Sequence, residues 1–333
     1  MLEFEKKIVH ILDCEHNTCI LSQGCTMDDN EEIIKALTSK VEKIFRSSAK
    51  KIAHFQETSG FLRLIEELKE GSMTFEAFSS KIAQHIFDKK MEHAQYRMCD
   101  LVIALLKKDD RRYLCILDNA CMNGITHMVS QDDGIIKADI IPYRTLISSN
   151  LTKNDSAILI ELSDVSIQCI ENKVEIEGEK VNFYADVILQ SKSTPSYKES
   201  VKSMTKLTEE LQSKYDLDMV QTMPKMKSLL VDNVDNSKPI EIDEIAEELF
   251  MDQPVIKEEF KQELKKQGIP QKIDVEYVKP TKMERVQKIK TDKGIELTIP
   301  VDYMNSTEFV EFCTQPDGTI SIQLKNILHI TSK

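Results

Sequence analysis

Glycine and proline are scarce in this chain of 333 residues, which contains only nine of each. Flexible linkers are usually rich in glycine, serine or proline, so long low-complexity linkers are not expected. Apolar residues make up 41% of the chain and charged residues 30%, a balance that indicates a globular rather than a disordered protein. The length is sufficient for two or three domains of ordinary size.

Long hydrophobic runs are also missing. The longest uncharged apolar run near the middle, LVIALL, is far too short to cross a bilayer. The opening residues, MLEFEKKIVHILDCE, place acidic side chains before any apolar segment, unlike a signal peptide. These features predict a soluble cytoplasmic protein without membrane contact.

Known motifs of phosphate binding and nucleophilic catalysis do not occur. The sequence has no G-x-G-x-x-G or G-x-x-x-x-G-K-[ST] loop and no G-x-S-x-G elbow. Paired carboxylates occur in EELKE and DEIAEEL, where helical spacing places them on polar faces. An enzyme would also need a pocket with convergent polar groups, which no pattern here indicates. We expect no catalysis and no cofactor, with an uncharacterised enzyme as one of three hypotheses.

The eight cysteines do not indicate a disulfide framework. Most lie in apolar segments such as YLCILD and SIQCIE, where cysteine behaves as a small buried hydrophobe, so we expect reduced thiols. The densest set of potential metal ligands has no close C-x2-C pair, and a hairpin would place its members on alternate faces. We therefore expect no bound metal at this set, which comprises His10, Cys14, His16, Cys19 and Cys25.

Residues 1–195 predict an α+β domain. The segments KIVHILD and TCILSQG flank a turn and predict a hairpin, and an amphipathic helix follows from Asp29 or Asn30. Further helices begin near FLRLIEELKEG and at Thr74. From Met98 strands dominate: a hairpin in MCDLVIALLKKDDRRYLCILDN, with GIIKADIIPY, SAILIELSD and VSIQCIENKVEI continuing the sheet. Segregated helices and strands favour an α+β fold, with an antiparallel or mixed sheet covered by helices.

Residues 196–270 predict a helical segment, and residues 271–333 a small β-rich C-terminal unit. Two apolar stripes begin at Tyr197 and Met219, and we interpret them first as core and second as an interface. Because short helices with methionine-rich stripes are poor isolated folds, we expect a homodimer formed through this segment. The helical pair that follows is rich in acidic residues, which favours packing or partner binding over DNA reading.

A basic run, KPTKMERVQKIKTDK, interrupts a chain whose formal charge is −12. If it forms a hairpin across TDKG, Lys288 and Lys290 share one strand face and could follow a phosphate backbone. Lysine on a solvated edge strand, where it prevents unwanted pairing, is the alternative interpretation. The candidate DNA contacts are Lys282, Arg285, Lys288, Lys290 and Lys293, assisted by Lys43, Arg46 and Lys50 of the first domain.

The order of these segments, from IVHILD to ISIQLKNI, resembles the bacterial nucleoid-associated protein family of the NdpA type. The resemblance is carried by FLRLIEELKEGSMTFEAFSSKIAQHIFD, DLVIALLKKDDRRYLCILD, SAILIELSDVSIQCIENKVEIEGEKVNFYADVILQSK and GIELTIPVDYMNSTEFVEFCTQPDGTISIQLKNI. It implies a cytoplasmic protein of the nucleoid, without enzymatic activity. DNA would be reached either by direct binding without strong sequence specificity or through a protein partner, as an adaptor.

Overall fold

A computed structural model describes residues 2–24, 30–217, 219–280, 282, 284–304, 306–317 and 319–331. The chain forms two compact units. The first comprises residues 1–45 and 50–193, and the second comprises residues 46–49 and 194–333. The three-part division expected from the sequence stays a prediction.

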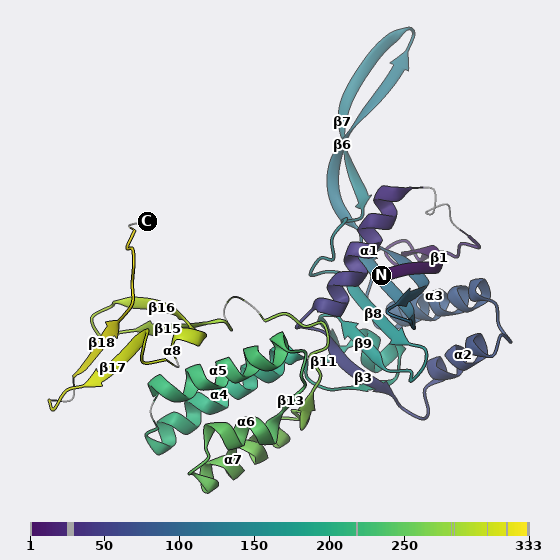
Figure 1. The fold of residues 1–333 in the computed structure, drawn as a ribbon. Helices are drawn as coiled ribbons and strands as arrows, with labels where there is room; N and C mark the ends of the chain where they lie inside the picture. Colours follow the sequence, from purple (N-terminus) through teal and green to yellow (C-terminus); the bar gives the residue numbers. More distant parts are fainter. Residues whose placement is uncertain are drawn as a thin grey trace. The chain divides into compact units, whose positions relative to one another are not determined.

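An eight-stranded antiparallel sheet forms the centre of the first unit, in the order β12-β3-β9-β8-β5-β4-β1-β2 (Figure 1). The two predicted hairpins are confirmed, because β1 pairs with β2 and Ile103 of β4 lies opposite Ile116 of β5. Strands β4 and β5 are buried along most of their length, as their continuous apolar sequences require. The sheet strands are β1 (Leu2–Asp13), β2 (Thr18–Ile20), β3 (Lys51–Phe55), β4 (Cys99–Lys108), β5 (Arg111–Ala120), β8 (Ser156–Glu161), β9 (Ile167–Ile170) and β12 (Ser191–Ser193).

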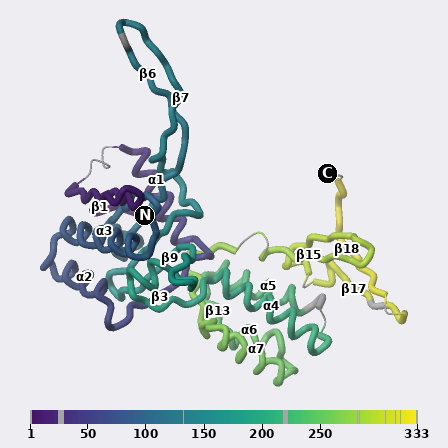
Figure 2. The backbone as a smooth tube through the Cα atoms, turned by 180° about the vertical axis from the view of Figure 1, so that it is seen from behind, coloured from purple at the N-terminus to yellow at the C-terminus, as the bar shows by residue number. Residues whose placement is uncertain are grey.

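Helices cover both faces of this sheet. Neighbouring residues of β5 point to opposite faces, and they pack against different helices. The ring of Tyr113 meets Phe45 of α1 edge-on, with centroids 5.1 Å apart, whereas Leu114 joins the apolar core beneath α2 and α3. The predicted α+β fold is therefore confirmed (Figure 2). The helical elements of this unit are α1 (Glu31–Arg46), α2 (Gly60–Lys69), α3 (Phe75–Glu92) and the π-helix η2 (Phe183–Ile188).

The predicted helix starts are confirmed where they lie in the described residues. The Asn30 side chain accepts hydrogen bonds from the backbone N–H groups of Glu32 and Ile33, and Thr74 accepts one from Ala77. These bonds satisfy backbone donors that the first helical turn leaves unpaired. The alternative cap, Asp29, lies outside the described residues.

The segment GIIKADIIPY does not continue the sheet, and this part of the prediction was wrong. Strands β6 (Met122–Asp132) and β7 (Ile135–Leu146) pair with each other in a separate two-stranded ribbon that projects from the unit (Figure 1). A two-residue turn closes the tip, where Asp133 and Gly134 both have positive φ angles. The tight turn pairs β7 with the strand before it rather than with the sheet. The end of VSIQCIENKVEI also leaves the sheet, contrary to the prediction, because strands β10 (Lys173–Ile176) and β11 (Glu179–Asn182) form another separate hairpin.

The helices of the second unit share one apolar core. Helix α4 begins with a capping box, in which Ser196 and Glu199 each bond the backbone N–H of the other. The described side chains of the two apolar stripes, Met204 and Met226 among them, are buried here, so the interpretation of these stripes as core is confirmed and the reason for a dimer through this segment no longer holds. The elements are α4 (Tyr197–Tyr215), α5 (Met219–Asp235), β13 (Ile240–Glu241), α6 (Ile242–Leu249), α7 (Pro254–Lys266) and β14 (Lys272–Ile273).

Two hairpins and a short helix end the second unit, around a small core of their own. Ile299, Met304 and Val310 are its buried members. The elements are β15 (Val286–Lys290), β16 (Glu296–Pro300), α8 (Val301–Met304), β17 (Val310–Thr314) and β18 (Ile320–Leu324).

Candidate nucleic-acid interface

The basic run forms the hairpin β15–β16, as predicted. Lys288 lies opposite Thr298 and Lys290 opposite Glu296, so both lysines project from one face. The alternate residues of β15 and β16, Ile289 and Ile299 among them, turn the other face toward the small core. The lysine face is exposed because the apolar face of the same hairpin is covered.

Acidic neighbours accompany most of these cations. Arg285 lies 2.6 Å from Asp235, Lys290 lies 3.2 Å from Glu296, and Lys293 lies 3.6 Å from Asp292. Exposed ion pairs of this kind are worth at most about 1 kcal/mol, so a phosphate can compete for each cation. Within the described part of the chain, Lys282 and Lys288 are exposed and form no ion pair.

The three candidates near the end of α1 have different environments. Lys50 is buried, and its ammonium donates to the carbonyl of Phe45 at 2.8 Å, which satisfies an orphan acceptor of the last helical turn. Lys43 is exposed, but its ammonium donates to the carbonyl of Leu151 at 2.9 Å. Arg46 is exposed. The first two therefore have structural roles in their own chain.

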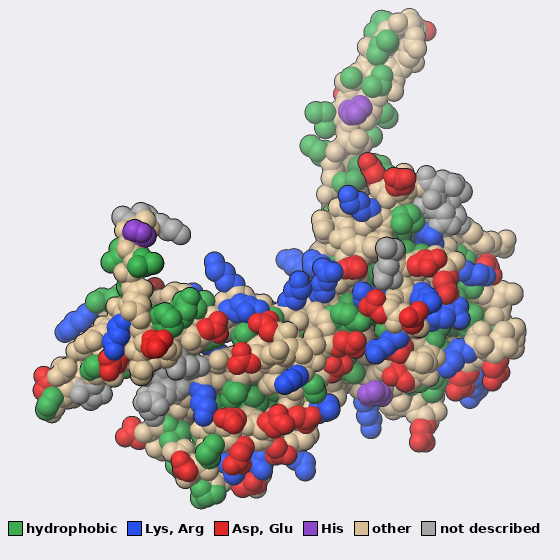
Figure 3. Space-filling view, in the orientation of Figure 1, with side chains coloured by type: hydrophobic (Ala, Val, Ile, Leu, Met, Phe, Trp, Pro, Cys, Tyr) green, Lys and Arg blue, Asp and Glu red, His purple; other side chains and the backbone are tan. Residues whose placement is uncertain are grey.

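Lysines of the acidic helical pair α6–α7 form ion pairs with part of its own acidic residues. Lys257 lies 2.6 Å from Glu247, and Lys261 lies within 3.3 Å of both Asp243 and Glu258. Space-filling Figure 3 shows positive and negative side chains intermixed over the helices of this unit. A helix that reads DNA offers free basic and amide groups instead. The pair thus matches the packing interpretation.

A pocket of about 300 Å³ in the first unit brings several polar side chains together, although no sequence pattern indicated one. In its wall, Asp118 accepts hydrogen bonds from Lys90 and from the hydroxyl of Tyr184, both at 2.6 Å. Glu171 accepts the backbone N–H groups of Tyr184 and Ala185 at the start of η2. These groups bind one another, which is the pattern of a structural network.

Charge attraction dominates this buried cluster. Burial alone would raise the pKa of Asp118, but the attraction of Lys90 and the hydrogen bonds from Lys90 and Tyr184 outweigh it and lower this pKa. Burial alone would likewise lower the pKa of Lys90, and the nearby Asp118 and Cys99 raise it instead. Both groups are therefore charged at neutral pH.

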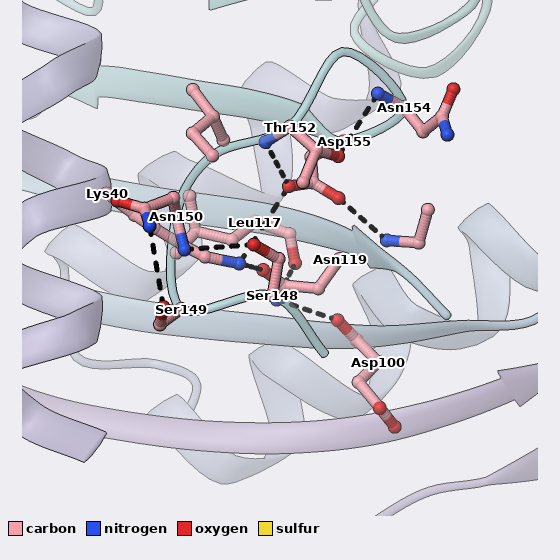
Figure 4. Close-up of polar contacts among 12 residues, drawn as sticks. Lys40, Asp100, Leu117, Asn119, Ser148, Ser149, Asn150, Thr152, Asn154 and Asp155 are labelled. Carbon is pink, nitrogen blue, oxygen red and sulfur yellow. Dashed lines mark hydrogen bonds and ion pairs between the residues drawn. The ribbon is translucent and has the colours of Figure 1, made fainter. Parts of the chain in front are cut away.

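A second buried lysine lies on the opposite face of the sheet, where the ribbon begins and ends (Figure 4). Lys40 of α1 donates to the side-chain oxygen of Asn119 and lies 3.9 Å from Asp155. Asp155 also accepts the backbone N–H groups of Ala120 and Thr152, at 3.0 and 2.7 Å. Burial lowers the pKa of Lys40 more than the attraction of Asp155 raises it. This network fastens the two ends of the ribbon segment to α1.

The potential metal ligands near the N-terminus are occupied in other ways. His10 is buried and accepts the backbone N–H of Ser22 through Nδ1, at 3.1 Å. His16 bonds Asp13 at 2.8 Å, and Cys14 belongs to the apolar core. Cys25 lies outside the described residues, within which no three His, Cys, Asp or Glu side chains converge as metal ligands. The seven described cysteines are free thiols.

The ribbon β6–β7 is the surface that sequence reasoning missed. Its large apolar side chains are exposed, and Figure 3 shows hydrophobic side chains along its length. An Asp-Gly pair between two segments of alternating residues, GITHMVSQ and IIKADIIPY, is the signal that could have found it. No described helix is both long enough and apolar enough to span a membrane.

The chain has an antiparallel α+β unit followed by a unit with an exposed basic hairpin, and comparison with known families places it among the nucleoid-associated proteins. The matching family model is described as NA37, nucleoid-associated protein YejK, and it covers residues 8–330. The chain belongs to this family. No curated protein matches it.

Proposed function

We propose that this protein acts at the bacterial nucleoid in the cytoplasm by binding DNA directly, without strong sequence preference and without catalysis. The contact is the exposed face of hairpin β15–β16. The observation that carries the proposal is the pair Lys288 and Lys290, side by side on a strand face whose reverse is buried. Lys282, Arg285 and Lys293 extend the basic surface, and Arg46 is a secondary candidate.

Phosphate recognition suits this surface better than base reading. Lysine offers a flexible point charge, whereas bidentate recognition of a base edge favours arginine, asparagine or glutamine. Binding by such cations releases counterions and weakens steeply with salt. The formal charge of −12 opposes DNA over most of the surface, so contact is centred on the basic hairpin.

Association through a protein partner is the alternative. The ion pairs of Arg285, Lys290 and Lys293 favour it, because each pair must open before that cation can meet a phosphate. In that case the basic hairpin is a solvated edge, and the pure protein binds no DNA.

The test replaces Lys288 and Lys290 by glutamine and measures binding to a mixed-sequence duplex by fluorescence anisotropy, between about 50 and 200 mM salt. Glutamine removes the charge without placing a second carboxylate opposite Glu296. Each lost phosphate contact lowers the slope of log affinity against log salt by about 0.9, so the slope should fall by about two. Affinity near 0.15 M salt should fall about tenfold to thirtyfold for every sequence.

The matched control is Lys69→Gln with Lys81→Gln, two exposed helical lysines of the first unit that form no ion pair with described residues. It changes the net charge by the same amount and should leave affinity and slope close to wild type. Equal losses in both variants would indicate a general charge effect. If the wild-type protein binds no duplex at low salt, direct binding is wrong and the partner-mediated function replaces it.

A further inference from the structure

The pocket beside the Lys90–Asp118 pair has lining groups that this buried pair does not use. Its volume of about 300 Å³ lies at the lower end of the range for small-molecule sites, which runs from about 300 to 1,000 Å³. The wall is formed by the end of α3 and the residues after it, the starts of β8 and η2, and the segment from β9 to β10. Its charged members are Lys90, Arg97, Asp118, Asp155, Glu171 and Lys173.

Three of these charged groups have charged partners inside the protein. The ammonium of Lys90 lies 2.6 Å from the carboxylate of Asp118. The carboxylate of Asp155 lies 3.9 Å from the ammonium of Lys40. The charged lining groups that form no ion pair with any residue described in the structure are Arg97, Glu171 and Lys173.

Glu171 lines the pocket as a carboxylate without a counter-charge. Its oxygens accept the backbone N–H groups of Tyr184 and Ala185, at 2.7 and 2.9 Å, and Cys169 donates its thiol at 3.3 Å. Burial raises the pKa of this carboxyl more than the hydrogen bonds lower it, and repulsion from Asp186 adds to the rise. A ligand that brings an ammonium group would supply the missing positive charge.

Arg97 brings to the same pocket a guanidinium that is already oriented. Its Nη1 donates to the carbonyl of Asn154 at 3.1 Å, and the rest of its planar fork forms no bond to a described residue. Such a fork matches the two oxygens of a carboxylate. Lys173 is exposed and adds a second positive charge to the wall. These two cations favour an anionic group in the ligand.

Apolar and aromatic side chains complete the wall. Phe183 is only 4% exposed, and its ring meets that of Tyr184 edge-on with centroids 5.5 Å apart, so its position is fixed by packing. Tyr96 is 49% exposed, and Val174 is partly buried. A ligand therefore meets apolar surface as well as both signs of charge in one small pocket.

We propose that this pocket binds a free α-amino acid with an apolar or aromatic side chain. The ammonium group of the ligand pairs with Glu171, its carboxylate pairs with Arg97, and its side chain packs against Phe183 and Tyr96. An inorganic anion satisfies the cations but leaves the Glu171 carboxylate unbalanced and repels it. A simple amine has the opposite fault, because it meets Arg97 and Lys173 without a charge to offset them.

The experiment titrates the full-length protein with L-phenylalanine and L-leucine by NMR observed on the ligand. Two analogues each lack one charge: phenylethylamine keeps the ammonium, and 3-phenylpropionate keeps the carboxylate. L-Phenylalanine should bind with a Kd of roughly 0.1 to 1 mM, as expected for a small ligand of this size. Each analogue should bind about tenfold to one-hundredfold more weakly, because it leaves a charged protein group without its partner.

The protein variants test the two charged contacts separately. Arg97→Gln should weaken L-phenylalanine about tenfold to one-hundredfold. Its matched control is Arg63→Gln, at an exposed arginine of α2 that forms no bond with a described residue, and this variant should bind as the wild type does. Glu171→Gln should weaken L-phenylalanine by a similar factor but bind 3-phenylpropionate at least as tightly as the wild type, which a misfolded pocket would not do.

Three results would overturn the proposal. The first is no binding of L-phenylalanine or L-leucine up to about 10 mM, tenfold above the expected range. The second is an analogue that binds as tightly as L-phenylalanine, because a single charge would then be sufficient. The third is an equal affinity for L-phenylalanine in Arg97→Gln and Arg63→Gln. The outcome is independent of DNA binding, which uses the second unit and is read in a separate titration.

Discussion

Replacing Lys90 by methionine removes the cation from the buried cluster on the α3 face of the sheet and keeps most of the apolar stem. Asp118, with a side chain only 10% exposed, then loses the ammonium at 2.6 Å and keeps the hydroxyl of Tyr184. Removing one partner of a buried ion pair costs about 3 to 5 kcal/mol, because an uncompensated charge is left in the interior. We expect a loss of this size in the stability of the first unit.

Hydrogen exchange of the β4 and β5 amides is the suitable assay, because it reports the opening of this sheet separately from the second unit. A loss of 3 to 5 kcal/mol corresponds to exchange that is about 100-fold to 5,000-fold faster at neutral pH. Adding Asp118→Asn to the Lys90→Met variant removes the stranded charge, so protection should largely return. Exchange within about threefold of wild type in the single variant would refute the assignment of Lys90 and Asp118 as a strongly coupled pair.

The effect of pH gives an independent check with a definite sign. In the wild type the folded pKa of Asp118 is lowered, so its stabilising contribution is present above the unfolded pKa and is lost as pH falls through the folded value. In the Lys90→Met variant burial is no longer opposed by the cation, and the carboxyl can protonate instead. The difference in stability between the Lys90→Met variant and the wild type should therefore become smaller as pH falls toward about 4.

Two further predictions concern a buried base and a helix cap. Burial lowers the pKa of His10 to about 4, so the stability of the first unit should be full above about pH 6.5 and decline by up to about 3 kcal/mol as pH falls to 4. In the His10→Asn variant the side chain can still accept the Ser22 N–H but does not titrate, so its loss of stability at low pH should be smaller. If hydrogen exchange of β1 depends on pH in the same way in this variant and in the wild type, the assignment to His10 is wrong. Ser196→Ala removes the side-chain half of the α4 capping box and should cost about 1 kcal/mol, whereas Ser196→Asp should retain most of it. Exchange in the first turn of α4 measures the difference, and unchanged protection in the alanine variant would count against the cap.

Local chemistry made much of the fold predictable. The caps at Asn30, Thr74 and Ser196 follow from side chains that satisfy the donors of a first helical turn. The β4–β5 hairpin follows from two apolar runs around a charged turn, and the helical stripes of the second unit correctly predicted its core. In each case the deciding interaction lies within a few residues of the chain.

The errors concern long-range partners. GIIKADIIPY has the pattern of a sheet strand, and that pattern is equally compatible with a two-stranded ribbon in solvent. Lys50 and Arg46 are both basic and lie close together in the sequence, but only the fold shows that the Lys50 ammonium donates to a helix carbonyl. Lys90, Asp118 and Tyr184 are far apart in the chain and have no local motif, so their convergence could not be read from spacing.

The ribbon β6–β7 lies in the connection between β5 and β8, so its length can change without a change in the sheet. These two strands pair directly, with Asp118 opposite Ser156, so residues between them can be added or removed at the Asp133–Gly134 tip without changing any sheet contact. Side chains alternate with a period of two, so one extra residue in each strand at the base of the ribbon would turn every side chain beyond it to the opposite face. Changes of length at the tip leave the faces of the remaining residues unchanged, whereas changes at the base preserve them only in steps of two residues per strand.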